Sequence, residues 1–587
     1  MNTNPAVASR RSPVARVATL GACLVLAACG SSQNYNDRPE YVSVGGDVSG
    51  LTGAVTLLNT IRQTGKNGRT TQGTDTVSLT ANGPFAFGLQ VARGSSYAVT
   101  VATQPQGQFC TITDGAGTAT GNVRSIVVTC KSNVTIGGTI TGLTGTVVLL
   151  QNGGNPLATA SNGPFTFTAA VQNGSVYAVL VRDQPLGQSC STENYTGIAT
   201  DNVTNVAVVC KNFAVRPLPA IYSTGQSVNY SAFRAGGPGA GEIPSDTDIV
   251  QDLGLLQDAG FNLLRLFGAD DVSEKILRLA AQYYPEMRFQ QGLVLFGVPP
   301  ANTGSCMDDY GGASNAQVAR AIALANTYSN VVTVSVGNET SFFSRYMPTI
   351  CLTNFITRVR NNVPDTMPVT ADDDWTFYAG LTAAGGDRAA VKPDTVLPLI
   401  DFVSIHTYAI LNDSYWDWKQ TGVPAGLARA EAMMRASAEG PQNASQPLGY
   451  AKYSYTQVAN YLYKDAAGNT VSTGASLPIT VGETGWKAVQ TNPASEIERY
   501  TALPVNQKWY YDLMNTWQAG AVGDPPRGTV GGPPTVFFFE AFDEAWKGID
   551  DGWGLWTRDR QPRYALCGTP AGSPCNDPVY QGAGYYP

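Results

Sequence analysis

Residues 213–587 alternate between short apolar runs and longer amphipathic stretches. In the stretch 245–260, apolar residues recur at the spacing of a helix, Ser245 precedes them as a capping residue, and Gly260 follows them. Alternation of this kind is typical of parallel βα units. Eight apolar runs separated by helical patterns over about 370 residues predict an α/β fold, a (β/α)8 TIM barrel with insertions. The expected strands are 226–231, 261–269, 288–298, 331–339, 367–374, 400–408, 478–486 and 535–544.

The chain before the barrel repeats itself. GLTG at 50–53 returns at 142–145, and NGPFAF at 82–87 returns as NGPFTF at 162–167. Alternating Val- and Thr-rich runs punctuated by Gly, Asn and Pro are typical of antiparallel sheets, so we expect two small all-β, sandwich-like modules, at 41–132 and 133–212. The early part of the first copy is about twelve residues longer, and we expect the extra length in the polar segment 64–74.

Two roles compete for these modules. They could bind carbohydrate, or they could hold a catalytic domain away from a membrane. Neither copy has a cluster of aromatic residues that would suit sugar stacking. The spacer role is therefore favoured.

The first 28 residues are typical of an export signal. Three arginines precede the apolar run 17–28, which is too short to span a bilayer as a helix. The run ends in Leu-Ala-Ala-Cys, which resembles the lipobox of bacterial lipoproteins and implies Cys29 as the lipidated N-terminus after processing; an ordinary cleaved signal is the alternative. Gly30 after the cysteine favours the outer membrane, facing the periplasm or the cell surface, with 29–40 as a tether.

Cysteines and charge narrow the classes of function. Apart from Cys23 in the signal segment and Cys29, the chain has eight cysteines. In an oxidising compartment we expect them to pair in sequential order. The net charge of -7 argues against nucleic acid, and a single histidine, His406, excludes a His-rich metal site, so we expect no metal and no cofactor. The expected disulfides are Cys110–Cys130, Cys190–Cys210, Cys306–Cys351 and Cys567–Cys575.

Polar residues gather where the predicted strands end. In TIM barrels this end of the strands carries the chemistry. Glu339 ends the fourth strand and Glu483 lies near the end of the seventh, and two facing carboxylates are what cleavage of a glycosidic bond requires. A separation of about 5 to 5.5 Å would mean retention of configuration, and a wider gap inversion. Further candidates at the mouth are Tyr230, Arg265, Asn338, residues 372–374, His406, Tyr408, Glu540, Asp543 and Glu544. Of these, we expect Tyr230, Arg265, Asn338, His406, Tyr408 and Glu544 to bind substrate.

Four motifs resemble the bacterial branch of family 17 glycoside hydrolases, retaining enzymes of clan A that act on β-1,3-glucans. They are VNYSAFR at 228–234, SVGNE at 335–339, VGETGW at 481–486 and FFEAFDEAWK at 538–547. The resemblance covers roughly residues 215–565. It departs from the family at Ala545, where proline is usual, and in DDGWG at 550–554, which affects the loop after the eighth strand.

The resemblance implies roles for individual residues. It makes Glu339 the acid/base and Glu483 the nucleophile. Asn338 would bind the sugar 2-hydroxyl, Tyr408 would lie beside the nucleophile, and Glu544 and Lys547 would form the family's further Glu-x-x-Lys pair on the eighth strand. We expect this pair to bind substrate; the alternative for Lys547 is that it tunes Glu544 by its opposite charge.

Other residues have two interpretations. Trp486, Trp546 and Trp553 are candidate platforms for sugar stacking, and burial in the core is the alternative for each. His406 is interpreted as a hydrogen-bonding wall of the cleft, with a structural role as the alternative. Three consecutive carboxylates at 372–374 point in different directions along a strand, so we assign them no metal.

The sequence thus predicts a lipid-anchored, monomeric, retaining glycoside hydrolase or transglycosylase that acts on β-1,3-glucan. An endo-β-1,3-glucanase and a β-1,3-glucanosyltransferase both fit the motifs. Two alternatives are a clan A hydrolase of β-1,4-glucan or mannan, and a non-catalytic glycan-binding surface lipoprotein.

Overall fold

The structure of the chain is a computed structural model. The signal segment 1–28, Cys29 with most of the tether, and Cys575 lie outside the described residues. The chain forms two compact units, residues 1–131 and 132–587, and each is described by itself. The described residues are 40–64, 68–299, 302–308, 311–341, 347–381, 393–411, 449–518, 532–570 and 572.

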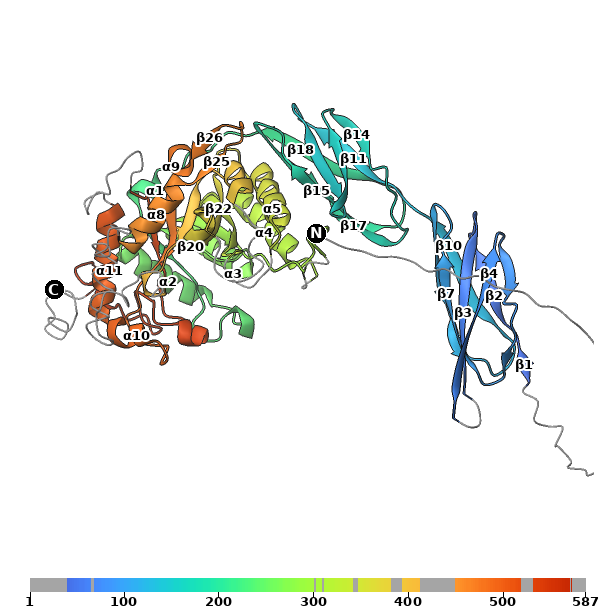
Figure 1. Cartoon of the computed structure of the whole chain (residues 1–587). Coiled ribbons are helices and arrows are strands. Elements are labelled where there is room, and N and C mark those ends of the chain that lie inside the picture. The colour runs from blue at the N-terminus through green and yellow to red at the C-terminus, as the bar shows by residue number, and fades with distance from the viewer. Residues whose placement is uncertain are drawn as a thin grey trace, which may run out of the picture. The chain divides into compact units, whose positions relative to one another are not determined.

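Eight parallel strands close into a barrel in chain order (Figure 1). Each lies within a predicted apolar run, so the predicted TIM barrel is confirmed. Most strands end before the predicted run does, so the last residues of those runs lie in the loops at the mouth. The strands are β19 (Gln226–Asn229), β20 (Phe261–Leu266), β21 (Arg288–Leu293), β22 (Val331–Asn338), β23 (Val369–Asp374), β24 (Val403–His406), β27 (Ile479–Thr484) and β28 (Val536–Phe538).

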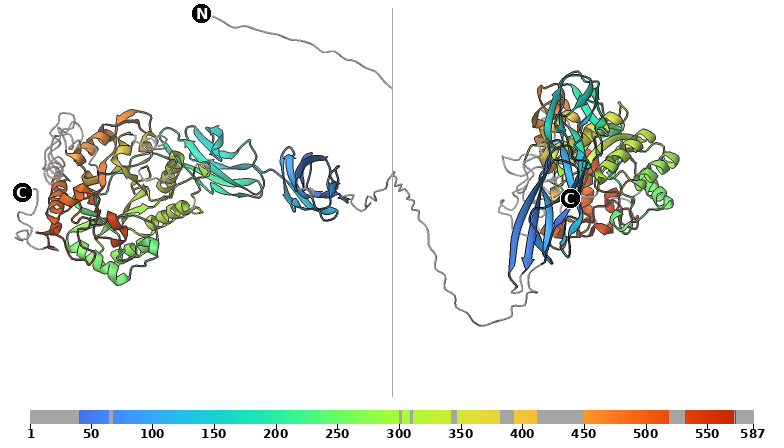
Figure 2. Two further views of the ribbon diagram at one scale, coloured as in Figure 1. Left: turned by 60° about the horizontal axis from the view of Figure 1, so that its bottom comes forward. Right: turned by 90° about the vertical axis from the view of Figure 1, so that its right-hand side faces the viewer.

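Helices surround the barrel strands, as the left view of Figure 2 shows. Ser245 caps the first long helix as expected, since its side chain accepts a hydrogen bond from the backbone of Asp248. The helices are α1 (Ile221–Thr224), α2 (Asp246–Asp258), α3 (Asp271–Tyr283), α4 (Ala313–Thr327), α5 (Thr349–Asn362), α6 (Trp375–Tyr378), α8 (Tyr450–Asn460), α9 (Thr473–Ser476), α10 (Glu496–Thr501) and α11 (Pro504–Gln518), with a small hairpin of β25 (Leu462–Lys464) and β26 (Thr470–Ser472).

The first β module has two four-stranded sheets, in the orders β5-β2-β10-β8 and β4-β3-β7-β9. Alternate residues of β3 point into its core, as the period of a strand requires. The strands are β1 (Tyr41–Val42), β2 (Val44–Ser49), β3 (Val55–Thr64), β4 (Thr70–Leu79), β5 (Gly83–Ala86), β6 (Val91–Ala92), β7 (Ser96–Thr103), β8 (Gln108–Thr113), β9 (Ala116–Thr118) and β10 (Val123–Ser132).

The second β module repeats this plan, with the orders β14-β11-β18-β16 and β13-β12-β15-β17. The sheets are mixed rather than purely antiparallel, because β2 pairs in parallel with β10, and β11 with β18. The strands are β11 (Ile136–Thr141), β12 (Val147–Gln151), β13 (Gly154–Thr159), β14 (Gly163–Thr166), β15 (Ser175–Asp183), β16 (Gln188–Glu193), β17 (Thr196–Ala199) and β18 (Val203–Asn212).

The difference in length between the two copies lies where the sequence predicts it. In the first copy, β3 and β4 pair as a long hairpin, from Val55 with Leu79 to Thr64 with Thr70. In the second, the hairpin of β12 and β13 turns already at Asn152 and Gly153. The extra residues therefore extend one hairpin.

Three of the expected disulfides are confirmed. Cys110 bonds Cys130 and Cys190 bonds Cys210, one bridge in each module. Cys306 bonds Cys351 in the barrel domain. Cys567 is also disulfide-bonded.

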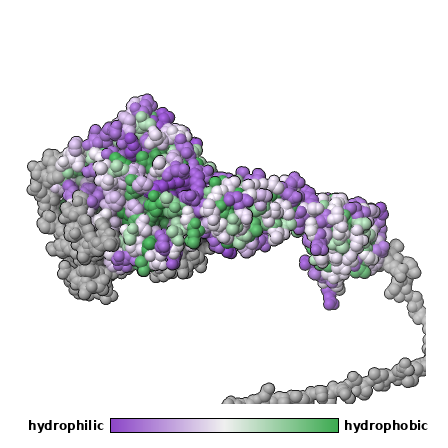
Figure 3. Space-filling view, turned by 90° about the horizontal axis from the view of Figure 1, so that it is seen from above, coloured by the Kyte–Doolittle hydropathy of each residue, from purple (hydrophilic) through white to green (hydrophobic). Residues whose placement is uncertain are grey.

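The described surface is mixed in character. On the face that Figure 3 shows, hydrophobic and hydrophilic residues are interspersed over the β modules. Among the described residues of the two modules, Tyr41 is the one aromatic residue that is largely exposed. No helix in the described part of the chain is long and apolar enough to cross a membrane.

A buried charge network joins the segment before β19 to the bottom of the barrel. Asp401 accepts hydrogen bonds from the backbone N–H of Arg216 and from the guanidinium of Arg360. Both arginine side chains are buried. Asp365, which is 76% exposed, pairs with Arg216 from outside.

We expect Asp401→Ala to lower the free energy of unfolding by about 3–5 kcal/mol, because it leaves the buried guanidinium of Arg360 without its counter-charge and the backbone N–H groups of Arg216 and Val369 without their acceptor. Asp365→Ala is the matched control, and it should cost under about 1 kcal/mol since the Asp365 carboxylate is exposed to solvent. Urea unfolding of both variants gives the two values. Equal losses would contradict the assignment of Asp401 as the buried counter-ion.

Candidate active site

Strands β22 and β27, which are separated by β23 and β24 in the barrel, bring the two predicted catalytic glutamates to its mouth. Glu339 follows directly after β22, and its backbone N–H donates to the carbonyl of Asp372 on β23 (2.9 Å). Its φ of +49° is a left-handed conformation that is costly for a residue with a side chain. Glu483 lies within β27, in register with His406 on β24. The strand ends thus aim both carboxylates into one space.

The two carboxylates lie close together. One oxygen of Glu339, one oxygen of Glu483 and a ring nitrogen of His406 all lie within 4.8 Å of one another. Both glutamates are buried, with 9% and 4% of their surface exposed. Two carboxyl groups this close can act on the same glycosidic bond.

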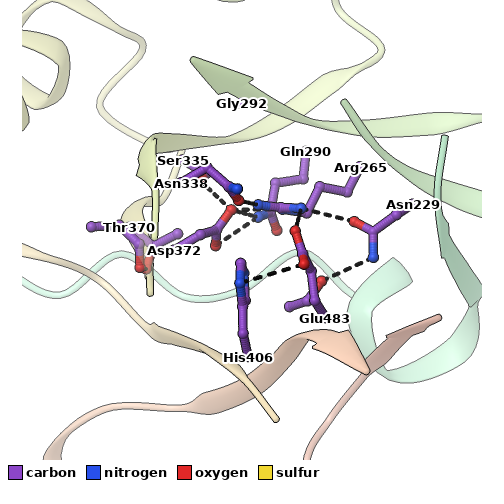
Figure 4. A network of polar contacts seen from close by, with 12 residues as sticks. Asn229, Arg265, Gln290, Gly292, Ser335, Asn338, Thr370, Asp372, His406 and Glu483 are labelled. Atoms are coloured by element: carbon purple, nitrogen blue, oxygen red, sulfur yellow. Dashed lines mark hydrogen bonds and ion pairs between the residues drawn. The ribbon is translucent and has the colours of Figure 1, made fainter. Parts of the chain in front are cut away.

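Arg265, at the end of β20, links the residues of the site (Figure 4). Its Nε donates to Asp372 (2.6 Å), and its Nη1 donates to Glu483 (2.7 Å) and to Asn229 (2.9 Å). Its Nη2 donates to the side-chain carbonyl oxygen of Asn338 (2.5 Å). Only 1% of the side chain surface is exposed. Arg265, predicted to bind substrate, therefore holds catalytic residues in place.

Asp372 supports Arg265 from below. Its carboxylate also accepts hydrogen bonds from Ser335 and from the side-chain amide of Gln290. Burial alone would raise the pKa of Asp372, but the guanidinium of Arg265 outweighs it and holds that pKa below its usual range. Asp372 therefore stays ionised as a counter-charge beneath the site.

His406 lies between the two glutamates. Its Nδ1 is 2.8 Å from an oxygen of Glu339 and 3.5 Å from one of Glu483. Burial lowers the pKa of His406, but the two carboxylates outweigh it and raise that pKa to about 9. The imidazole is therefore charged at neutral pH and donates to Glu339. Gly482 makes room beside it, since a Cβ there would lie 2.2 Å from Ser404 Oγ and 3.4 Å from the ring.

The surroundings of Glu339 favour its protonated form. Burial raises the pKa of Glu339, while the hydrogen bond and the charge of His406 pull that pKa down, with a net shift upward. Glu483, by contrast, receives hydrogen bonds from Arg265 and from the hydroxyl of Tyr408 (2.8 Å). Burial and the charge of Glu483 raise the pKa of Tyr408 well above its usual value, so its hydroxyl keeps its proton and remains a donor.

A second charged cluster lies at the end of β28. Lys547 bridges Glu540 (2.6 Å) and Glu544 (2.5 Å), and its ammonium lies over the ring of Phe539, 4.4 Å from the centroid. Glu544 also accepts a hydrogen bond from Ser231 (2.5 Å). Burial raises the pKa of Glu540 well above its usual value, against the opposing effect of Lys547. Lys547 therefore pairs with Glu544 as predicted, and it pairs with Glu540 as well.

The three candidate tryptophan platforms differ in exposure. Trp546 is 39% exposed at the barrel mouth and packs on the backbone of Gly237. Trp486 and Trp553 are each 1% exposed. The indole N–H of Trp486 donates to the backbone carbonyl of Thr501, so this ring packs inside the protein. Trp546 alone of the three offers a face to a sugar.

Tyr230 is not brought into the site. It is 1% exposed, and its hydroxyl donates to Asp252 on α2 (3.3 Å), outside the barrel strands. Tyr230 lies one residue beyond the end of β19, next to Asn229, which does reach Arg265. Neighbouring residues of a strand point to opposite sides, which explains the different placement.

The three consecutive aspartates bind three different sets of partners. Asp372 binds Arg265, Asp373 accepts from Thr340 and Ser341, and Asp374 caps α6. Burial raises the pKa of Asp373 to about 7. The three side chains diverge as the sequence predicts, and they hold the segments around Glu339.

Glu339, His406 and Glu483 have the spacing of metal ligands. A cation there would compete with the guanidinium already bonded to Glu483 and with the proton on His406. We therefore assign the cluster to acid–base chemistry.

Sequence reasoning missed Asn229 and Gln290, and it named Asp372 and Glu540 as candidates at the mouth without giving them a role. Three of them lie on the barrel strands beside assigned residues. Buried polar residues in otherwise apolar runs were the available signal, since such groups need partners inside the protein.

No family model matches the chain, and no curated protein matches it in sequence. Similar solved structures include a glycoside hydrolase family 17 β-1,3-glucanosyltransferase from Rhizomucor miehei, at 17% identity and a TM-score of 0.39, with 60% of this chain and 99% of that chain covered. A plant β-glucan endohydrolase has 16% identity and a TM-score of 0.38, over 57% and 98% of the chains. A β-glucuronidase from Ruminococcus gnavus has 12% identity and a TM-score of 0.37, over 88% and 84%. These values are low, so we base the fold on the closed eight-stranded sheet and the chemistry on the site.

Proposed function

We propose that this chain is a retaining glycoside hydrolase or transglycosylase. The observation that carries the proposal is the approach of the Glu339 and Glu483 carboxylates, with oxygens within 4.8 Å. Their surroundings also differ as the two roles require. Glu339, with its raised pKa, protonates the glycosidic oxygen, and Glu483, held by Arg265 and Tyr408, attacks the anomeric carbon.

The reaction has two steps. In the first, the bond from C1 to the leaving oxygen breaks, a bond from C1 to Glu483 forms, and the proton of Glu339 goes to the leaving oxygen. In the second, Glu339 takes a proton from water or from a sugar hydroxyl, whose oxygen displaces Glu483 from C1. Arg265 fixes the side-chain carbonyl oxygen of Asn338, which leaves the amide nitrogen of Asn338 to donate to the sugar 2-hydroxyl.

We propose β-1,3-glucan as the substrate. The motifs around both glutamates and the Glu544–Lys547 pair support this choice, as does the exposed ring of Trp546 at the mouth. Hydrolysis and transfer differ only in the acceptor of the second step, and the chain's resemblance to the bacterial branch of family 17 admits both. The ordered contacts around Glu339 and Glu483 favour a catalytic role over a purely glycan-binding one.

We also propose that Cys29 carries a lipid anchor, and that the chain is an outer-membrane lipoprotein and a monomer. The short apolar run that ends in Leu-Ala-Ala-Cys supports the anchor. The scarcity of exposed aromatic residues in the described parts of both β modules supports a spacer role for the first module.

Azide rescue distinguishes the two glutamates. With an activated aryl β-glycoside of laminaribiose, Glu483→Ala should abolish turnover, and azide should restore it with an α-glycosyl azide as product. Glu339→Ala should slow hydrolysis of laminari-oligosaccharides by roughly 10²–10⁴-fold, and azide should yield a β-glycosyl azide. Product configuration is read by proton NMR. Exchanged configurations would mean that the two roles are reversed.

The pH profile tests His406. Its hydrogen bond and positive charge lower the pKa of Glu339, so His406→Ala should raise that pKa further. The acid must be protonated to work, so the alkaline limb of kcat/KM should move to higher pH, by about one unit. Tyr408→Phe is the matched control, because it removes a bond to Glu483 and should leave that limb in place. A shift of the limb to lower pH in His406→Ala would refute this role.

A further inference from the structure

The second β module is bonded to helix α5 of the barrel. The side chain of Asn354 accepts from the backbone N–H of Val181 (3.0 Å) and donates to the carbonyl of the same residue (2.9 Å). Two helical turns further along α5, Asn361 donates to the carbonyls of Ser189 (2.9 Å) and Val209 (3.2 Å). Both asparagines are buried, so these bonds form a closed interface.

Apolar residues of the module enter the core of the barrel domain. Leu180 and Tyr195, 1% and 6% exposed, pack in the same hydrophobic cluster as the barrel strands. The hydroxyl of Tyr195 donates to Asn315 on α4, and the guanidinium of Arg358 on α5 lies 5.7 Å from its ring centroid. Glu193 also pairs with Arg358 (3.3 Å).

The first module lacks this docking surface. With the offset of 80 residues between the copies, Leu180 corresponds to Thr100 and Tyr195 to Gly115. Thr100 is exposed, as is Thr113, the counterpart of Glu193. The contact residues therefore belong to the second copy specifically and are no general property of the repeat.

The same module also touches a turn on the mouth side of the barrel. Its hairpin tip, Asn152 and Gly153, meets Gly304 in the segment that follows β21. A Cβ on Gly153 would lie 2.8 Å from Cα of Gly304, and one on Gly304 would lie 2.4 Å from the carbonyl oxygen of Asn152. Only glycines permit this approach.

A disulfide joins the two contacts of the module. Cys306, in the turn 302–306, is bonded to Cys351 in the first turn of α5. The turn follows β21 and α5 follows β22, so the bridge links the segments on the mouth side of the two strands beside Glu339. Strand β21 ends at Leu293, in register with Val336, three residues before Glu339.

We propose that the second β module is a fixed part of the catalytic unit. Through the turn 302–306 and α5, the module positions the side of the cleft where the leaving group departs and the acceptor sugar enters. This inference rests on the proposed function. Glu339 delivers its proton to the leaving oxygen, so the leaving sugar lies on the side of Glu339. The segments that follow β21 and β22 begin on this side. In the transfer step the acceptor hydroxyl occupies the same place, loses its proton to Glu339 and forms the new bond to C1 as the ester to Glu483 breaks. Asn152, Gly153, Asn354 and Asn361 are positioning residues.

Gly153→Ala tests the proposal, with Gly174→Ala as the matched control. Both glycines belong to the second module and have positive φ, +72° and +86°, but a Cβ on Gly174 would meet nothing within 4 Å. On linear β-1,3-oligosaccharides, Gly153→Ala should raise KM or lower the ratio of transfer to hydrolysis on the order of tenfold, because the acceptor side is displaced. With an aryl β-laminaribioside, whose leaving group needs no sugar subsite, kcat/KM should stay within about twofold of the native chain. Gly174→Ala should change neither.

Hydrogen exchange supplies a readout that does not depend on activity. Gly153→Ala and Asn361→Ala should each speed amide exchange in the turn 302–306 and the first turn of α5, by about tenfold, while Gly174→Ala should not. If Gly153→Ala and Gly174→Ala behave alike in exchange, or alike on oligosaccharides while the native chain is active, the proposal is overturned. If the native chain turns over neither substrate, the proposed function fails, and the exchange result still decides the docking.

Discussion

The buried guanidinium of Arg265 is the interaction on which the rest of the site depends. It is bonded to Asp372, Glu483, Asn229 and Asn338, which come from four other strands of the barrel. A buried cation requires partners on its donors, and the planar fork of arginine can serve several oxygens at fixed angles. The parallel strands supply those oxygens because their ends meet at one face. Catalytic geometry and the packing of the barrel are therefore one arrangement.

Electrostatics then separates the two glutamates. Both are buried and lie within one small space, where two full negative charges would repel each other strongly. Glu483 is bonded directly to Arg265, while Glu339 is bonded to His406, and burial leaves the pKa of Glu339 raised. The ion pair of Arg265 with Glu483 thus gives Glu483 a permanent counter-charge. Among the described residues, Glu339 has no guanidinium bonded to it, and its raised pKa lets it carry a proton.

Much of this organisation could be predicted from the sequence, because apolar periodicity and repeats determine which segments become strands. These patterns predicted the eight barrel strands, the two modules, the long first hairpin and three disulfides. Side-chain direction at a strand end was not, which is why Tyr230 and Trp486 were assigned to the mouth although they pack inside the protein. The docking of the second module on α5 was also missed, since it depends on two asparagines that carry no periodic signal.

Proton NMR of the first product formed tests the central claim most directly. The chain is mixed with a linear β-1,3-oligosaccharide, and the anomeric proton of the newly formed reducing end is followed before mutarotation. Two carboxylates with oxygens within 4.8 Å imply double displacement, so the β anomer should appear first and the α anomer only later. An initial α anomer would mean direct attack by water and would contradict the roles of Glu339 as acid/base and Glu483 as nucleophile.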